Sequence, residues 1–455
     1  MENINYGRPS KDFAEIRFGD KRLDARLRTT VDALTKNPQE SILSGCKSKH
    51  GAKAFYALLS NDKFSSDTIT KAAREATKER IKSSGITEVL LPQDTTDINL
   101  NGHRKTEGLG LCGNLHTKGV QVHSCIALTP NGTPLGLVTQ QYSTRTTEKN
   151  NLTSDQKQRR PIEEKESYRW LETVRDALEV VPEAITPIIL CDREGDFYEL
   201  YSEMQSLNAS FIVRVMRDRA TIDADKTIQQ IRRTHACGEV VVSIPRDTRN
   251  TIPARTAKME VAYCTIAVAK PKLVKSEKAS LTLTLVRITE MSVSGDAIEW
   301  ILATNLPVAS TEDAMKIVAY YIQRWKIERF HYVLKSGCQV EKIQQRTYDR
   351  ILPMLFLYSV ISVFVLAMTY FARYYADRPC DGFLEDSEWK LLYRLATKSK
   401  AVPKEPYPIK AAVEYLGQLG SYKHSPSDGD YGVKSIWKGL TKLFDALDLL
   451  DTLMG

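Results

Sequence analysis

The chain has 455 residues, of which 42% are hydrophobic, and it carries a net charge of +8. This length is enough for two or three domains with sizeable cores. The first 85 residues hold 17 Lys and Arg against 11 Asp and Glu, so six of the eight net positive charges lie in under a fifth of the chain. This asymmetry predicts a polyanion-binding end, with nucleic acid as the first candidate.

The cysteines and the first residues argue against two classes of protein. The eight cysteines are scattered, without a C-x-x-C pair or a histidine at the spacing of a zinc site. The opening sequence MENINYGRPSKDF lacks the apolar segment of a secretory signal. We therefore expect reduced thiols and a cytoplasmic protein.

Three helices are predicted in the basic N-terminal part, over residues 20–36, 51–60 and 66–83. In the first helix, apolar residues recur at helical spacing, and Arg22 and Arg26 lie on the side left to solvent. A solvated basic face is common on surface helices, but several such helices in one basic segment favour DNA binding. We therefore predict a helical DNA-binding domain over residues 1–85.

The pattern changes to α/β after a linker at residues 83–85. Apolar, β-rich segments separated by turn residues predict strands, with a hairpin signal at 130–132 and a helix at 165–180. The strands are expected at 88–94, 119–129, 134–140, 188–192 and 211–215. This order predicts a three-strand meander followed by strands that alternate with helices, which is an α/β core.

Residues 217–306 differ from the α/β core in their predicted secondary structure. Four strands joined by polar turns are expected there, at 238–244, 259–269, 281–289 and 298–305. We interpret this segment as an all-β insertion into the core.

Residues 311–335 are predicted to form one long helix with start and stop signals at its ends. Four of its residues, separated by 3, 4 and 7 positions, return to one side of a helix: Tyr321, Arg324, Glu328 and Lys335. Much of the remaining circumference is apolar, so these polar groups must pair with one another or bind something. A structural ion-pair network and a functional site both fit this stripe.

The 22 uncharged residues at 351–372 are long enough to cross a bilayer. The segment is solitary, has a basic residue on each side and lies late in a charged chain, so we expect a buried core helix rather than a membrane span. A helical C-terminal region follows, and it ends at 433–453 with an amphipathic stripe suited to packing or self-association.

Three carboxylates come from three separate elements of the predicted core. Asp94 is expected at the C-terminal end of the first strand and Asp192 at the end of the fourth, where open α/β sheets usually place their sites. Glu328 would join them from the long helix. Converging carboxylates repel one another unless a divalent cation lies among them, and oxygen ligands suit magnesium or manganese. Two such ions about 4 Å apart serve phosphodiester chemistry.

These motifs together resemble the DDE cut-and-paste transposases of bacterial insertion sequences, in the Y-R-E-K subgroup that includes the transposon-five enzyme. The order of the three carboxylates matches, and so does the spacing Tyr321-x₂-Arg324-x₃-Glu328-x₆-Lys335. Further matches are Asp94-Thr95-Thr96, Asp192-Arg193-Glu194 and the segment FGDKRLDARL at 18–27. The resemblance covers nearly the whole chain. One departure is Gly195, where alanine is common.

The resemblance implies an RNase H-like catalytic core over residues 86–375, flanked by the N-terminal helical domain and a C-terminal helical dimerisation region at 376–455. A β insertion would account for the 136 residues between Asp192 and Glu328. The implied function is binding of the element's terminal inverted repeats, Mg-dependent cleavage and joining of the 3′-hydroxyl ends to target DNA. Homodimers in the bacterial nucleoid are implied as well, with no membrane partner.

The resemblance also implies residue roles. Asp94, Asp192 and Glu328 would hold two Mg²⁺, for which Mn²⁺ would substitute. The phosphate contacts would come from Tyr321, Arg324, Lys335 and Arg214. Trp300 would stack on a flipped base, although a tryptophan in an apolar strand is more often a core residue. His331 would contact the edge of the site or pack.

Three further acids compete with the chosen carboxylates. Asp97 is expected past its strand end, and Glu194 and Asp196 are expected to enter the next helix, where they would orient neighbours or solvate the rim. Two other functions stay open. One is a metal-dependent nuclease without strand transfer, and the other is a non-catalytic DNA-binding regulator of transposition. The basic N-terminal region argues against the first, and the complete set of motif residues argues against the second.

Overall fold

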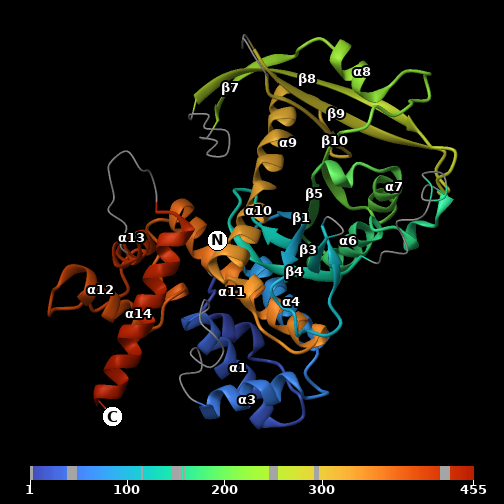
Figure 1. Ribbon diagram of the computed structural model, residues 1–455. Helices are drawn as coiled ribbons and strands as arrows, with labels where there is room; N and C mark the ends of the chain where they lie inside the picture. The colour runs from blue at the N-terminus through green and yellow to red at the C-terminus, as the bar shows by residue number, and fades with distance from the viewer. Residues whose placement is uncertain are drawn as a thin grey trace.

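The computed structural model describes residues 4–37, 49–113, 116–145, 153, 156, 159–244, 255–291, 297–420 and 431–454. Figure 1 shows a central sheet, helices packed on it, a group of strands at one end and a group of helices at one side. The fold is thus mixed α/β, as predicted.

Within the described residues, ten strands form one mixed sheet. They are β1 (Glu88–Asn99), β2 (Gly110–Cys112), β3 (Thr117–Leu128), β4 (Pro134–Ser143), β5 (Thr186–Cys191), β6 (Ser210–Arg214), β7 (Gly238–Ile244), β8 (Arg255–Ala269), β9 (Ser280–Glu290) and β10 (Glu299–Thr304). β1 pairs in parallel with β5, and β5 in parallel with β6, whereas β3 runs antiparallel to β1 and β4. The predicted meander and the two parallel strands after it are therefore present.

The strand β1 is longer than predicted. It continues past Asp94 to Asn99, because its second half pairs with β3 as far as Gly119. Its pairing with β5 ends earlier, at Pro92 and Leu190. Asp94 therefore lies inside a strand, and the prediction of a strand end there was wrong.

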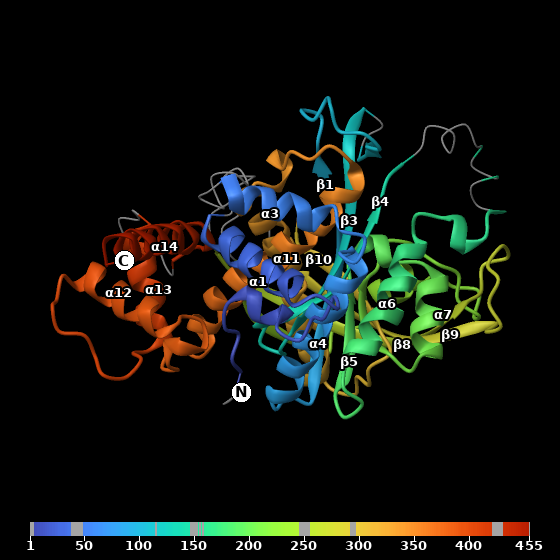
Figure 2. The same cartoon turned by 90° about the horizontal axis from the view of Figure 1, so that it is seen from below.

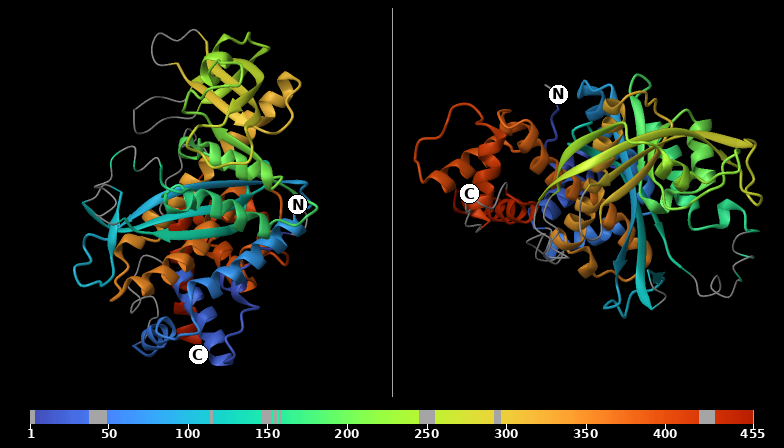
Figure 3. Two further views of the ribbon diagram at one scale, coloured as in Figure 1. Left: turned by 90° about the vertical axis from the view of Figure 1, so that its right-hand side faces the viewer. Right: turned by 90° about the horizontal axis from the view of Figure 1, so that it is seen from above.

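The predicted insertion differs in two respects. Its strands extend the central sheet, because β10 pairs antiparallel with β6 and is followed by β9, β8 and β7. It also contains a helix, α8 (Thr227–Arg233), so the segment is not all-β. Two basic residues end this short helix, and Ile231 anchors it in the core. In the left view of Figure 3, the yellow-green insertion and the blue N-terminal helices lie at opposite ends of the molecule.

The N-terminal helices are η1 (Pro9–Phe13), α1 (Lys21–Lys36), α3 (Lys49–Leu59) and α4 (Ser66–Ser83). Asp20 and Ser65 cap α1 and α4, since each side chain accepts a hydrogen bond from a backbone N–H of the first turn. α4 packs on the sheet, where Thr77 and Arg80 donate hydrogen bonds to the carbonyl oxygens of Leu137 and Leu135 in β4. The basic N-terminal part is thus joined to the core through α4.

The apolar segment forms α11 (Tyr348–Tyr374) at the centre of the molecule. By length and composition it could cross a membrane, but 94% of its most apolar window is buried inside the structure. It contacts β4, α4 and the C-terminal helices α13 (Ile409–Leu419) and α14 (Val433–Met454). The prediction of a buried core helix is confirmed.

The C-terminal helices α12 (Asp386–Thr397), α13 and α14 form a group at one side of the core (Figures 1 and 2). The apolar stripe of α14 is buried within the chain, from Ile436 to Phe444. Leu449 and Leu453, in its last turns, are 61% and 74% exposed. The stripe is therefore used for packing, and only the end of the helix presents leucines to solvent.

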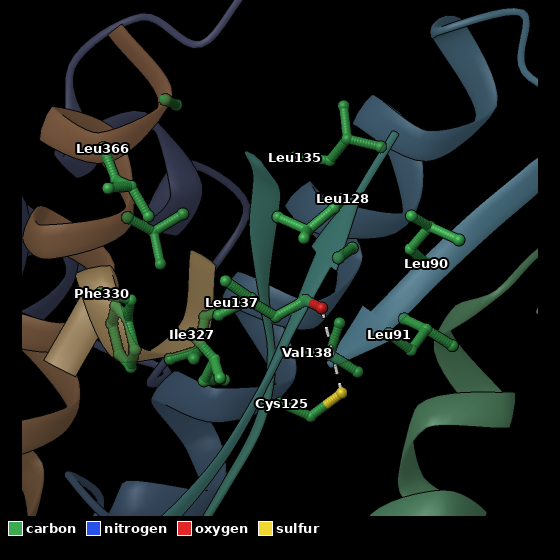
Figure 4. Packing of buried hydrophobic residues seen from close by; sticks show 14 of the residues in the cluster. Leu90, Leu91, Cys125, Leu128, Leu135, Leu137, Val138, Ile327, Phe330 and Leu366 are labelled. Atoms are coloured by element: carbon green, nitrogen blue, oxygen red, sulfur yellow. Dashed lines mark hydrogen bonds between the residues drawn. The ribbon is translucent and has the colours of Figure 1, made fainter. Parts of the chain in front are cut away.

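The core between the sheet and the helices is apolar and close-packed. Figure 4 shows side chains of β3 and β4, among them Leu128 and Leu137, on the side of the sheet where Phe330 of α10 (Trp325–Tyr332) and Leu366 of α11 lie. Burial of these side chains fixes α10 against the face of β1 from which Asp94 projects.

Candidate active site

Asp94 is held in a largely buried position on β1. Its Oδ1 atom accepts a hydrogen bond from the backbone N–H of Thr95 at 2.8 Å. Burial raises the pKa of Asp94 to about 7, and the charges of Asp192 and Glu328 act in the same direction, while Arg324 opposes them. Three carboxylates from three elements therefore share one electrostatic environment.

Asp192 follows the last residue of β5, at the strand end where the sequence placed it. Its Oδ1 atom accepts a hydrogen bond from the backbone N–H of Glu194 at 2.8 Å, which caps the short helix η4 (Arg193–Gly195). This bond orients the carboxylate at the edge of the sheet and leaves its second oxygen for another partner.

Glu328 lies on α10 and pairs with Arg324 one turn earlier. The Arg324 Nη2 atom is 2.6 Å from Glu328 Oε1, and its Nη1 atom is 3.8 Å from Asp94 Oδ2. Nη1 is buried and has no hydrogen-bond partner among the described residues. We call Asp94, Asp192, Glu328 and Arg324 the carboxylate cluster.

The predicted single helix over 311–335 is interrupted. α9 (Thr311–Gln323) ends before Arg324, α10 begins after it, and a π-helical turn, η5 (Val333–Gly337), carries Lys335. At the break, Arg324 N–H donates to Tyr321 O and Ile327 N–H donates to Arg324 O, so the helix tightens locally. The predicted start is confirmed, because Ser310 and Asp313 form a capping box.

As placed, no three His, Cys, Asp or Glu side chains of the described residues are close enough together to hold a metal ion. Arg324 lies between Asp94 and Glu328 and supplies positive charge there. The donor chemistry fits a hard divalent cation, since carboxylate oxygens are the ligands that such a cation prefers and a cation would offset the repulsion that Asp192 and Glu328 exert on Asp94.

Aromatic and basic side chains adjoin the cluster. The ring of Tyr321 lies edge-on to that of Trp300, with centroids 5.7 Å apart, and the Arg324 guanidinium is 5.8 Å from the Tyr321 ring. Arg214, at the end of β6, lies 5.8 Å from the Trp300 ring. Burial raises the pKa of Tyr321 to about 12 and lowers the pKa of Arg214. The structure thus brings these four predicted residues together.

Lys335 and His331 continue this side of the helix. Lys335 is half-buried, whereas His331 is buried and its Nε2 atom has no hydrogen-bond partner among the described residues. Burial, with the nearby charge of Lys335, lowers the pKa of His331 to about 3. His331 is therefore neutral and packed beside Phe330, with ring centroids 5.3 Å apart.

The competing acids have partners of their own. Asp97 lies within β1, not past its end, and accepts hydrogen bonds from the backbone of Gly113 and the side chain of Gln121, both at 3.1 Å. Glu194 is 3.5 Å from Arg169. Neither Asp97 nor Glu194 is part of the carboxylate cluster.

Asp196 is 2% exposed and accepts five hydrogen bonds. Its donors are Tyr201 Oη at 2.9 Å, the backbone N–H groups of Met216 and Arg217 at 2.7 Å each, and Arg219 Nε and Nη2 at 3.2 and 2.9 Å. We call this arrangement the Asp196 clamp. It ties the turn after Asp192 to the connection that leaves β6. Asp196 therefore orients its neighbours, as predicted, but it does not solvate the rim.

Arg22 and Arg26 lie apart from the carboxylate cluster, on α1. Arg22 is exposed and Arg26 half-exposed, and α1 contacts α3, α11 and α14. Among the described residues neither has an ion pair. Their positive charge is thus available to a ligand.

Three carboxylates thus lie in one electrostatic environment with two arginines and two aromatic rings beside them. Residues 9–64 match the family model described as "Transposase DNA-binding", and residues 164–364 match the "Transposase DDE domain". The two matches support a DDE-type transposase with DNA as its partner. They include Arg22, Arg26, Asp192 and Glu328, whereas Asp94 precedes the second match.

Among solved structures, the chain resembles "Cryo-EM structure of piggyBac transposase synaptic complex with hairpin DNA (SNHP)". The two are 11% identical, and the alignment covers 96% of this chain and 73% of that one, with a TM-score of 0.34. A likeness at this score carries no argument about the site.

Proposed function

We propose that this protein is a cut-and-paste DNA transposase of the bacterial Y-R-E-K subgroup, with an RNase H-like core. It binds the inverted repeats at the ends of its element, cleaves DNA there and joins the freed 3′-hydroxyl ends to target DNA. The observation that carries the proposal is the carboxylate cluster, in which Arg324 lies between Asp94 and Glu328, and burial with the charges of Asp192 and Glu328 raises the pKa of Asp94.

Asp94, Asp192 and Glu328 are the residues that would hold the divalent cations, for which we propose Mg²⁺, with Mn²⁺ as a substitute. Bound cations of this kind activate an attacking oxygen and stabilise a leaving oxygen in phosphodiester chemistry. In this proposal Asp94 comes from β1, Asp192 from the residue after β5 and Glu328 from α10.

The neighbouring side chains bind and orient DNA in this proposal. The unpartnered Nη1 atom of Arg324 donates to a phosphate oxygen, and Lys335 adds a point charge further along. The Tyr321 hydroxyl keeps its proton at neutral pH and can donate it in a hydrogen bond. Trp300 is half-buried, so part of its ring is open for stacking on a base.

The N-terminal helices bind the DNA ends. Arg22 and Arg26 make phosphate contacts, and the excess charge of residues 1–85 makes affinity fall steeply with salt. We expect the double variant Arg22→Ala, Arg26→Ala to reduce the slope of log K against log salt by about 0.9 for each phosphate that the protein no longer neutralises. An unchanged slope would remove these arginines from the interface.

The protein works as a homodimer in the bacterial cytoplasm, at the nucleoid, in this proposal. The exposed leucines at the end of α14 support a contact between two copies. We also propose the domain limits at residues 85 and 375 that the sequence predicts. Size-exclusion chromatography of the protein with and without an end fragment tests the dimer. A monomer in both runs would contradict it.

The decisive experiment incubates a labelled end fragment from the DNA that flanks the gene with the protein, with and without Mg²⁺, beside Glu328→Gln. The proposal expects metal-dependent cutting at the repeat boundary, a free 3′-hydroxyl and joining to plasmid, all absent in the variant. Cutting without joining would favour a nuclease. Binding without cutting by either protein would favour a regulator.

A further inference from the structure

Four polar side chains form a hydrogen-bonded chain across β1, β3 and β5, on the face of the sheet opposite Asp94. Gln93 and Thr95 flank Asp94 in β1, so their side chains project to the other face. His123, in β3, lies directly across from Thr95, and the fourth member is Cys191, the last residue of β5. Gln93, His123 and Cys191 are at most 1% exposed.

The donors and acceptors of this chain follow from the chemistry of its members. The Gln93 amide N–H donates to Cys191 Sγ at 3.5 Å, so its oxygen faces His123 Nε2 at 2.9 Å. His123 must therefore carry its proton on Nε2, because an amide oxygen only accepts. Its Nδ1 atom is then free to accept from the Thr95 hydroxyl at 2.8 Å. Every link has one donor and one acceptor.

The surroundings of His123 hold this tautomer in place. Trp170, a buried residue of α6 (Tyr168–Val180), packs against the imidazole with ring centroids 4.7 Å apart. Burial, together with the charge of Arg169, lowers the pKa of His123 well below its ordinary value. The ring is therefore neutral.

Both ends of the chain adjoin residues of the carboxylate cluster. At one end, the backbone N–H of Thr95 donates to Asp94 Oδ1 at 2.8 Å. At the other end, Cys191 immediately precedes Asp192. A shift of either end of the chain would therefore move a carboxylate.

The backbone pairing of β1 with β5 ends just before these aspartates. The last pair in register is Pro92 with Leu190, and proline has no N–H with which to extend the ladder. The next residues, Gln93 and Cys191, are joined by side chains instead. The hydrogen-bonded chain thus continues the contact between the two strands up to the residues that precede Asp94 and Asp192.

We propose that His123 is a positioning residue, and that the chain from Thr95 through His123 and Gln93 to Cys191 sets the separation of Asp94 and Asp192 for divalent-cation binding. The inference rests on the proposed function, because it takes these aspartates as metal ligands. Residues behind a metal site typically change its metal affinity 10- to 100-fold when they are altered. His123 has this role without contacting metal or DNA.

The test measures Mn²⁺ binding to the full chain by electron paramagnetic resonance of the free ion, and unfolding in urea in parallel. His123→Asn keeps an acceptor for Thr95 but loses the link to Gln93. Thr95→Val removes one hydroxyl and keeps the shape of the side chain. Thr77→Val is the matched control, because its buried hydroxyl bonds Ala73 O and Leu137 O in α4 and β4.

We expect Thr95→Val and His123→Asn to weaken Mn²⁺ binding about 10- to 100-fold, and Thr77→Val to leave it unchanged. Unchanged Mn²⁺ affinity in Thr95→Val, with stability lowered as in Thr77→Val, would overturn the inference and leave His123 a packing residue. If His123→Asn does not fold, Thr95→Val decides alone. Asp94→Asn is measured beside them, because wild-type Mn²⁺ affinity in that variant would overturn the proposed metal site itself.

Discussion

The carboxylate cluster and the Asp196 clamp are both built from acids and arginines, and two of their acids, Asp192 and Asp196, lie only four residues apart along the chain. Asp196 accepts five hydrogen bonds, two of them from Arg219. Among the described residues, Asp94 accepts one hydrogen bond and faces Arg324 at 3.8 Å. A carboxylate whose lone pairs are all used is fixed in place, whereas one with unused lone pairs can take a ligand. The difference separates a structural acid from a candidate catalytic one.

The largest effect is expected from Asp94→Asn. Loss of one carboxylate removes cation stabilisation worth several kcal/mol, so cleavage of an end fragment should fall about 10³-fold or more. Affinity for DNA in an electrophoretic mobility shift should not fall. The free energy of unfolding without metal should stay level or rise, because a repelling charge is gone. Cleavage at the wild-type rate would show that Asp94 is outside the site.

Asp196→Ala should affect stability, whereas Asp94→Asn should affect cleavage. Asp196→Ala leaves Arg219 and two backbone N–H groups buried without their acceptor, which should lower the free energy of unfolding by about 3–5 kcal/mol. Urea unfolding checks this value, with Asp223→Ala, an exposed acid of the same region, as the control expected within about 0.5 kcal/mol of wild type. A fully stable Asp196→Ala protein would remove the distinction between the two regions.

The pH dependence of stability should report the carboxylate cluster. Asp94 keeps its proton in the folded state up to a pKa of about 7, whereas in the unfolded state it ionises near the ordinary value of 3.8. The unfolded state therefore binds fewer protons between these values, and stability contributed by Asp94 is lost as pH rises from about 4 to 7. Urea unfolding of metal-free protein should show this fall, and Asp94→Asn should flatten it. Identical profiles would contradict the raised pKa.

The smallest effect is expected from exchanging arginine for lysine in the two regions. Arg324→Lys keeps the charge but loses one of the two N–H groups with which the guanidinium can bind. The loss of one hydrogen bond to a charged group costs about 1.5 kcal/mol, so cleavage should slow about tenfold. Stability should hardly change. Arg219→Lys should instead lower stability by a similar amount and leave the rate per folded molecule unchanged. Rate loss in both variants would mean that the two regions act as one.

Local sequence signals predicted most of the elements. Ser65 and the periodic apolar residues after it fix α4 at 66–83, and the alternation of β7 gives its limits at 238–244 without reference to a partner. The extension of β1 past Asp94 could not be predicted from local sequence signals, because residues 94–97 are polar. That half of the strand is held by β3, which lies more than 20 residues away.

For the candidate site, the sequence predicted which side chains lie near one another but not the contacts between them. Spacing placed Tyr321, Arg324 and Glu328 on one side, and the structure joins them. The break in the helix at Arg324 could not be predicted, because no glycine or proline lies there. The five donors of Asp196 come from residues 5 to 23 positions away, and the partners of His123 from other strands. Such pairings depend on the assembled sheet, so no local pattern contains them.

The position of α11 has a consequence for synthesis on the ribosome. The N-terminal elements η1, α1 and α4 pack against this helix, whose last residue is Tyr374. At about 5–20 residues per second, roughly 15 to 60 s separate the completion of α4 from that of α11. During this interval the basic N-terminal segment lacks one of its packing partners. The packing of the N-terminal elements against α11 is therefore completed late in translation.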